Sequence, residues 1–398
     1  MKNAIYSELE AIEVIIKCTE RCNINCSYCY YFNGNNKEYE QYPKVVSPET
    51  VDQICRFLSE AADELNLKAI QIDFHGGEPM MMKKDQFESM CNKLVDALQD
   101  KVRLSFAIQT NATLVDDDWI EIFSKFNIGV GVSLDGPKHI NDMYRLDHKG
   151  RSTYEKTANG VKQLQAAVAA EKIEPISVLS VIDPKYNATE MYNHFIHEMK
   201  FWGADFLLPD FTKETFDYQD IPAYTEFLKE LFDVWKADFN TNRIRIIDSF
   251  LGHFSESDSG YAFSTGKAKA VAFVIQSNGD LGPDDTLRST GAWKNVNPRP
   301  NIYQHSLVEY LHHPAILYLE EAAHKIPDEC SECCWKNVCG GGGILAHQYS
   351  EKDNSCNHAS VYCDSLQEFY AYLTSFLIDN GLNIEKVESI LFEEKVEA

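Results

Sequence analysis

Hydrophobic residues in the first half of the chain follow two alternating patterns. Short runs rich in β-branched and aromatic residues predict strands, and between them apolar residues recur with the period of a helix. In the first helical stretch Val51, Ile54, Leu58 and Leu65 share one face, and Ser47 is placed to cap it. The predicted strands are Glu13–Lys17, Ala69–Phe74, Arg103–Gln109, Ile128–Leu134, Ile176–Ile182 and Asp205–Leu208. Further helices are predicted at Lys84–Leu98, Asp116–Phe126, Tyr154–Ala169 and Ala188–Met199.

Each strand–helix step spans about 30 residues, the size of a βα unit. Six such units predict an α/β fold with a parallel sheet, open or barrel-like, and chemistry at the carboxyl ends of its strands. The rhythm breaks at Phe211, where one amphipathic helix near Pro222–Phe239 precedes a loop rich in Ser, Gly and Asp. We therefore predict an α/β core over residues 1–210, a helical bridge over 211–265 and a smaller domain over 266–398.

The net charge of the chain argues against some classes of binding partner. The chain of 398 residues carries 61 acidic and 37 basic side chains, a formal net charge of −24, which argues against nucleic-acid binding and against anionic membranes. No run approaches the roughly 18 apolar residues of a spanning helix, and acidic residues interrupt the N-terminal region where a signal peptide would be apolar. We expect a cytoplasmic protein, in which the twelve cysteines are better explained as metal or cluster ligands than as disulfides.

Four cysteines crowd the N-terminal end. Cys22, Cys26 and Cys29, spaced x3 and x2, directly follow the first predicted strand. Three thiolates can hold three irons of a [4Fe–4S] cluster and leave the fourth iron open to a small ligand. A zinc knuckle is the alternative, disfavoured by three ligands on one loop of a βα fold. Cys18 is a rival ligand, since it lies a further four positions before Cys22.

The segment CNINCSYC, with Tyr28 between its last two cysteines, resembles the signature of the radical SAM superfamily. The resemblance implies a partial (β/α)6 TIM barrel and favours Cys22, Cys26 and Cys29 as ligands. It also implies that S-adenosylmethionine chelates the open iron and, on reduction, yields a 5′-deoxyadenosyl radical that abstracts a substrate hydrogen. In such enzymes the cofactor supplies the difficult chemistry, and the protein positions the reactants and excludes water.

The second predicted strand ends in Gly76-Gly77-Glu78-Pro79, which resembles the GGEP motif of the same family. Paired glycines permit a close backbone approach to a ligand, and a glutamate can accept hydrogen bonds from an ammonium group. The resemblance therefore implies that Gly76, Gly77 and Glu78 contact the methionine amino group. An ordinary turn at a strand end is the alternative.

Polar residues also end the third and fourth predicted strands. By resemblance, Asn111 and Ser133 contact the ribose or the methionine, and Arg145 pairs with the methionine carboxylate. Arg151 lies close to Arg145 in sequence and is an alternative partner for that carboxylate. Both strand ends are also rich in residues that favour turns, so ordinary turns are the alternative explanation for these polar residues.

A second group of cysteines lies near the C-terminus. Cys330, Cys333, Cys339 and one later cysteine suit a cluster with four thiolate ligands, with a zinc ribbon as the alternative. The segment resembles the SPASM extension of radical SAM peptide maturases. The resemblance favours Cys363 over Cys356 as the fourth ligand, because SVYCDSL fits the closing motif of that extension.

The chain departs from the full SPASM pattern, which has seven cysteines and two auxiliary clusters. Phe263–Asp285 contains no cysteine, and Asp284 and Gly343 stand where the pattern has two further cysteines. In the family these missing positions are ligands of a single auxiliary cluster. The resemblance thus implies two [4Fe–4S] clusters in this chain, one that binds S-adenosylmethionine and one auxiliary.

Several longer tracts resemble one subgroup, the cyclophane-forming (triceptide, Xye-type) maturases of ribosomally made peptides. These tracts are CYYFN, YRLDHKGRSTYEKT, LLPD, NGDLGPDDTLR, CGGGG and SVYC. The resemblance implies a C–C crosslink between an aromatic ring and the β-carbon of a residue two positions later in a precursor peptide. It also implies an auxiliary cluster that takes an electron, and a reductase such as flavodoxin or ferredoxin. Asp285 is the candidate base, although Asp284 and Asp285 together could simply cap a turn.

Two other functions stay open from the sequence. Another SPASM modification is the enzymatic alternative: formylglycine formation, epimerisation or thioether formation. An iron–sulfur electron-transfer protein is the non-catalytic alternative, disfavoured because a carrier needs neither an open iron nor a nucleoside pocket.

Overall fold

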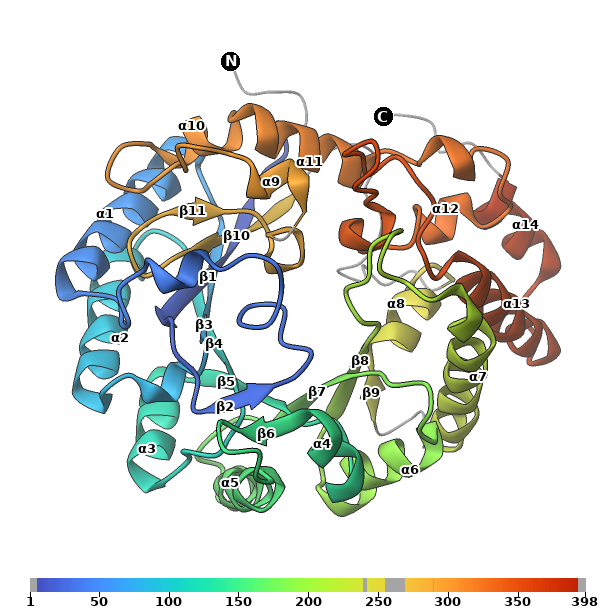
Figure 1. Cartoon of the computed structure of the whole chain (residues 1–398), viewed down its shortest axis with the longest axis horizontal. Helices are drawn as coiled ribbons and strands as arrows, with labels where there is room; N and C mark the ends of the chain where they lie inside the picture. Colours follow the sequence, from blue (N-terminus) through green and yellow to red (C-terminus); the bar gives the residue numbers. More distant parts are fainter. Residues whose placement is uncertain (1–5, 239–241, 255–268, 289, 393–398) are drawn as a thin grey trace.

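The computed structural model describes residues 6–238, 242–254, 269–288 and 290–392 (Figure 1). The predicted boundary between bridge and C-terminal domain, at residue 265, lies outside these residues, as does Phe239 at the end of the predicted bridge helix. None of the helices in the described part of the chain has the length and apolar character that a membrane span requires.

A curved sheet with helices on its outer side forms the core (Figure 1). All six predicted strands are present and pair in parallel in chain order, as β1, β3, β4, β5, β7 and β8. The predicted α/β fold with a parallel sheet is confirmed. The strands of the main sheet are β1 (Ala11–Thr19), β3 (Ala69–Gly76), β4 (Arg103–Thr110), β5 (Ile128–Ser133), β7 (Ser177–Val181), β8 (Gly203–Leu207), β9 (Arg243–Ile244), β10 (Ala270–Ile275) and β11 (Leu281–Gly282).

The predicted helices are also present. Ser47 caps α1 by accepting a hydrogen bond from the Thr50 amide at 3.1 Å. The predicted helix at Ala188–Met199 divides into α6 and a wider π-helical turn over Asn193–Glu198. The helices are α1 (Pro48–Leu65), α2 (Lys84–Leu98), α3 (Asp117–Phe126), α4 (Lys138–Tyr144), α5 (Tyr154–Ala169), α6 (Ala188–Tyr192), α7 (Ile221–Asp238), α8 (Arg245–Gly252), α9 (Gly291–Lys294), α10 (Leu307–Leu311), α11 (Pro314–His324), α12 (Lys336–Cys339), α13 (Cys363–Asp379) and α14 (Ile384–Phe392).

The two faces of the strands differ in composition. On β5, Val130 and Val132 are buried, whereas Gly129, Gly131 and Ser133 on the opposite face keep part of their surface exposed. Because side chains alternate along a strand, the buried face packs against the outer helices and the other face lines the inside of the sheet. At Gly131 the Gln109 side chain fills the space beside the strand on this face.

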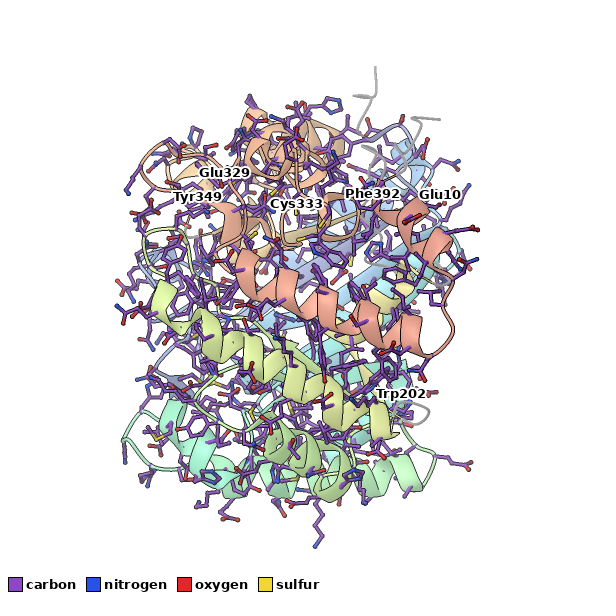
Figure 2. The ribbon with its side chains drawn as sticks, turned by 90° about the vertical axis from the view of Figure 1, so that its right-hand side faces the viewer. Glu10, Trp202, Glu329, Cys333, Tyr349 and Phe392 are labelled. Carbon is purple, nitrogen blue, oxygen red and sulfur yellow. The ribbon has the colours of Figure 1, made fainter. Side chains whose placement is uncertain are left out.

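The C-terminal part of the chain contributes strands to the same sheet. β10 pairs in parallel with β1, β11 pairs with β10, and β9 extends the other edge beside β8. Farther along the chain, α13 packs against α7, and Figure 2 shows these two helices side by side. The sequence analysis did not identify these added strands, which place the segment after β10 next to the inside of the barrel.

Candidate active site and cluster sites

The N-terminal cysteines lie on the loop that follows β1. A short strand of this loop, β2 (Ile24–Cys26), pairs with β6 (Arg145–Asp147), so that Cys26 lies opposite Arg145. The thiols of Cys22, Cys26 and Cys29 interact electrostatically with one another. Burial raises the pKa of Cys22 to about 12 and also raises that of Cys26, so both thiols hold their protons until a metal displaces them.

Cys18 lies apart from this group. It is fully buried within β1, and its thiol donates to the Ile16 carbonyl at 3.6 Å. Cys55 on α1 and Cys91 on α2 are likewise buried in the main hydrophobic core. The structure therefore brings together the three cysteines expected to bind the first cluster and leaves these others as packing residues.

The end of β3 lies against the start of the cysteine loop. The Gly77 amide donates to the Thr19 carbonyl at 2.8 Å, and the Glu78 amide donates to the Arg21 carbonyl at 2.9 Å. A side chain at Gly77 would lie 2.7 Å from the Cys22 nitrogen and closer still to the Arg21 carbonyl. Only glycine therefore fits here. The sequence predicted a close backbone approach to a ligand here. The structure shows that the backbone at Gly77 lies close to the backbone of Arg21 and Cys22.

Glu78 connects two strand ends. Its buried carboxylate accepts hydrogen bonds from the Thr110 hydroxyl at 2.7 Å, the Asn111 amide at 2.8 Å and the Met80 amide at 3.1 Å. The sequence analysis expected this carboxylate to bind an ammonium group. In the structure both oxygens already have partners inside the protein, and they fix the ends of β3 and β4 beside the cysteine loop.

Asn111 and Ser133 lie where the sequence analysis expected them, at the ends of β4 and β5. The Asn111 side chain donates to the Asn23 side-chain oxygen at 2.9 Å and lies 3.9 Å from the Cys22 sulfur. Ser133 accepts from the Gln109 amide group at 2.7 Å. Both polar groups thus line the same end of the barrel as the cysteine loop.

Arg145 is the buried positive charge of this region. Its guanidinium donates to the Tyr28 hydroxyl at 2.8 Å, and that hydroxyl donates to Asp135 at 2.6 Å. Arg151, the alternative from sequence, instead pairs with Asp147 and is 66% exposed. Of the two arginines, only Arg145 is placed to attract an anionic group beside the cysteines.

A second polar group lies on the inner face of β1 and β3. Lys17 forms a buried ion pair with Asp285, which begins a short turn after β11, and the Tyr30 hydroxyl donates to the same Asp285 oxygen at 3.0 Å. Burial opposes the charge of Asp285, but Lys17 and Arg288 outweigh it and hold the pKa of Asp285 below its usual value. Burial and the Lys17 charge lower the pKa of His75 to about 4, so this neighbour is neutral.

The structure separates the two aspartates that the sequence analysis could not assign. Asp284 caps the turn, because its side chain accepts from the Thr286 amide at 2.9 Å. Asp285 does not share that role and instead pairs with Lys17. Sequence reasoning missed Lys17, Tyr30 and His75. The one available signal was a lysine that ends the otherwise apolar run Val14–Ile16.

The C-terminal cysteines form a second group. The thiols of Cys330, Cys333 and Cys339 all neighbour Cys363, which begins α13. Burial raises the pKa of Cys330 to about 11 and of Cys339 to about 12, and in both cases the Cys363 thiol adds to the effect. Figure 2 labels Cys333 among the loops of this segment.

Cys356 does not join this group. It is buried in a separate small core with Leu287 and Leu345, and its amide donates to the Tyr318 hydroxyl at 3.1 Å. Gly343 has φ +79°, a conformation that a cysteine rarely adopts. Cys330, Cys333, Cys339 and Cys363 are thus the donors that would hold a four-thiolate cluster.

Comparison with known proteins agrees with this geometry. The model of the Radical SAM superfamily matches residues 16–195, which include the three loop cysteines and the strand ends around them. The chain is a radical SAM enzyme. As such it uses S-adenosylmethionine and [4Fe–4S] clusters, and the three thiols of the loop after β1 fit a cluster with one open iron.

Several relatives of this radical SAM enzyme are similar over nearly their whole length. The cysteine-type anaerobic sulfatase-maturating enzyme of Clostridium perfringens is 27% identical over 385 residues, covering 94% of this chain and 99% of the relative. The serine-type enzyme of Bacteroides thetaiotaomicron is 27% identical, covering 89% of this chain and 87% of the relative. A solved structure of anSMEcpe with bound AdoMet and Kp18Cys peptide is 26% identical with a TM-score of 0.76, covering 93% of this chain and 99% of that chain.

Proposed function

We propose that this radical SAM enzyme modifies a ribosomally made precursor peptide by joining an aromatic ring carbon to the β-carbon of a residue two positions later. A peptide substrate is supported by the similarity to a structure that holds a peptide. The observation that carries the crosslinking proposal is Asp285, a buried carboxylate paired with Lys17 beside the cysteine loop.

The bound cofactors would supply a hydrogen-abstracting radical at Cys22, Cys26 and Cys29 and an electron acceptor at Cys330, Cys333, Cys339 and Cys363. The β-carbon loses a hydrogen atom, the new C–C bond forms, and the ring then loses one electron and one proton. Asp285 takes that proton, because its pKa is held low enough to keep it ionised near neutral pH. The peptide thus loses two hydrogen atoms for each crosslink.

Other residues hold the reactants in place. We propose that Arg145 attracts the carboxylate of S-adenosylmethionine, since it is a buried cation opposite Cys26. The backbone of Gly76 and Gly77 and the side chains of Tyr28, Asn111 and Ser133 complete the pocket. Glu78 acts indirectly, because its carboxylate fixes the strand ends that form this pocket. A flavodoxin or ferredoxin is the proposed electron donor.

Formylglycine formation is the second candidate, supported by the names of the similar enzymes. Two departures from the full SPASM pattern favour the crosslink instead, because Asp284 and Gly343 stand where that pattern has cysteine. Asp284 caps a turn, and Gly343 has a positive φ. One auxiliary cluster is enough for a crosslink, which needs one electron acceptor and one base.

The test is anaerobic co-expression with the short open reading frames that flank the gene, followed by mass spectrometry of the peptides. The proposal expects loss of two hydrogen atoms and fragmentation that is blocked between an aromatic residue and the residue two positions later. A serine oxidised to formylglycine also loses two hydrogen atoms, so an aldehyde-reactive hydroxylamine probe must be applied as well. Labelling by the probe with normal fragmentation would establish the second candidate.

A further inference from the structure

The two oxygens of Asp285 have different environments. Oδ2 receives both the Lys17 ammonium and the Tyr30 hydroxyl, whereas Oδ1 is buried and has no hydrogen-bond partner. The side chain as a whole keeps 10% of its surface exposed. A buried carboxylate oxygen without a partner costs free energy, so this atom is available for a group that arrives with the substrate.

Lys17 is the residue that creates this asymmetry. Its side chain is completely buried on β1, and its ammonium lies 4.9 Å from the centre of the Tyr31 ring. The ion pair joins residues 268 positions apart, one in the barrel and one in the segment after β11. A lysine ammonium is too costly to bury without a counter-charge, so the position of Lys17 fixes the position of Asp285.

We propose that Lys17 is a positioning residue of the crosslinking reaction, which holds Oδ2 of Asp285 and leaves Oδ1 as the atom that takes the ring proton. This inference rests on the proposed function. In the step concerned, the ring radical formed by C–C bond formation loses its C–H proton to Oδ1, and the electron pair of that bond restores the aromatic ring. The unpaired electron would be accepted by a cluster held at Cys330, Cys333, Cys339 and Cys363. Lys17 itself exchanges no proton and does not touch the peptide.

The charged groups around Asp285 determine how its pKa changes when Lys17 is removed. Burial raises the pKa of both Asp284 and Asp210, which makes them weaker sources of negative charge, and His75 is neutral. Removal of Lys17 leaves Arg288 as the remaining cation and burial as the opposing effect, so the pKa of Asp285 should rise. The titratable and charged groups that face it are Lys17 of β1, Tyr30 and Tyr31 of the cysteine loop, His75 of β3, Asp210 after β8, and Asp284 and Arg288 of its own turn.

The experiment compares Lys17→Met, Lys17→Arg and the control Lys84→Met in reconstituted enzyme, with the peptide that the wild type crosslinks. Lys84 is a surface lysine that pairs with Asp116 and Asp118. The measured quantity is the number of crosslinks per 5′-deoxyadenosine as a function of pH. For Lys17→Met this ratio should fall about tenfold near neutral pH and recover as pH rises, because a carboxyl is only about one-tenth ionised when burial raises its pKa to about one unit above the pH of the measurement.

A second readout separates positioning from mere structural support. With a peptide deuterated on the aromatic ring, Lys17→Met should show a primary isotope effect on crosslinking that the wild type lacks. Lys17→Arg, which keeps the charge, should retain most of the ratio, and Lys84→Met should match the wild type. If Lys17→Met does not fold, Lys17→Gln is measured in its place with the same expectation.

Two failures are distinguishable. A wild-type enzyme that forms no crosslink on any flanking peptide overturns the proposed function. A wild type that crosslinks, with a Lys17→Met variant that keeps the same pH profile and shows no ring isotope effect, overturns the role of Lys17 alone.

Discussion

Residues only four positions apart on this chain have different roles. Cys18 is packed in the core of β1, whereas Cys22 lies on the loop, 3.9 Å from the Asn111 side-chain nitrogen. A cluster with three protein ligands has no spare thiolate, so each of the three loop cysteines is needed. A buried cysteine outside the cluster contributes only packing.

We expect Cys22→Ala to abolish reductive cleavage of S-adenosylmethionine and Cys18→Ala to retain it. Cys18→Ala removes one buried sulfur and should lower the free energy of unfolding by about 1 kcal/mol. Formation of 5′-deoxyadenosine with dithionite as reductant measures cleavage, and circular dichroism checks the fold. Equal loss of cleavage in the two folded variants would show that Cys18 is a ligand.

Asp210 shows how burial next to other carboxylates makes stability depend on pH. Burial, with Asp284 and Asp285 adding to it, raises the pKa of Asp210 to about 7, and the nearby His347 has its pKa lowered by burial to about 4, so it provides no positive charge. An unfolded aspartate titrates near pH 3.9. Between about pH 4 and pH 7 the folded chain therefore binds more protons than the unfolded chain, and stability falls as pH rises.

We expect Asp210→Asn to be more stable than the wild type, by a margin that grows between about pH 5 and pH 7 and then stays constant. The reason is that asparagine does not ionise in the buried site. Thermal unfolding of the reconstituted enzyme at several pH values measures the margin. Asp100→Asn, on an exposed aspartate after α2, is the control and should show no such trend.

Among the secondary-structure elements, the ends of β3 and β4 and the strand β6 position the cysteine loop. The end of β3 donates hydrogen bonds to the segment that leads into the cysteine loop, and β2 of that loop pairs with β6. Glu78 connects the same end of β3 to the end of β4. Backbone contacts from the end of β3 and from β6 therefore hold the cysteine loop on two sides.

Gly77→Ala should disrupt this contact, because the new methyl group would lie 2.7 Å from the Cys22 nitrogen. We expect the rate of S-adenosylmethionine cleavage to fall at least about tenfold, which corresponds to an activation free energy raised by roughly 1.4 kcal/mol, while the sheet stays intact. Gly129→Ala on β5 is the matched control, since its methyl group would have no neighbour closer than 3.7 Å. If both variants cleave S-adenosylmethionine equally well, the close approach at Gly77 is not essential.

For the molecule as a whole, the C-terminal segment extends the sheet. It adds β10 beside β1, brings Asp285 to Lys17, and carries the four cysteines proposed as ligands of the second cluster. Radical chemistry at one cluster and electron removal at the other would then take place within one folded unit.

We expect about eight irons per chain after anaerobic reconstitution, since each [4Fe–4S] cluster holds four. Cys363→Ala should reduce the count towards about four while leaving S-adenosylmethionine cleavage measurable, and Cys356→Ala should match the wild type. Iron and sulfide analysis measures the count. A wild-type value near twelve would mean that a third cluster is present.

The sequence by itself determined the local features of this protein. The alternation of apolar runs fixed all six core strands and most of their helices, because strand and helix periods depend only on neighbouring residues. The segment CNINCSYC likewise implied the cofactor through its resemblance to the radical SAM signature, because its three cysteines lie on one loop and need no distant partner. The resemblance favoured Arg145 and left Arg151 as an alternative, and the pairing of β6 with β2 places Arg145 opposite Cys26.

Only the tertiary structure decided what depends on contacts between distant segments. The addition of β10 to the sheet could not be read from a short apolar run, and the pairing of Lys17 with Asp285 spans 268 positions. The resemblance already favoured Cys363 over Cys356, and the structure adds that Cys363 neighbours Cys330 whereas Cys356 is buried in a separate small core. Such pairings are set by the packing of whole elements and not by local pattern, and they place the candidate base inside the barrel.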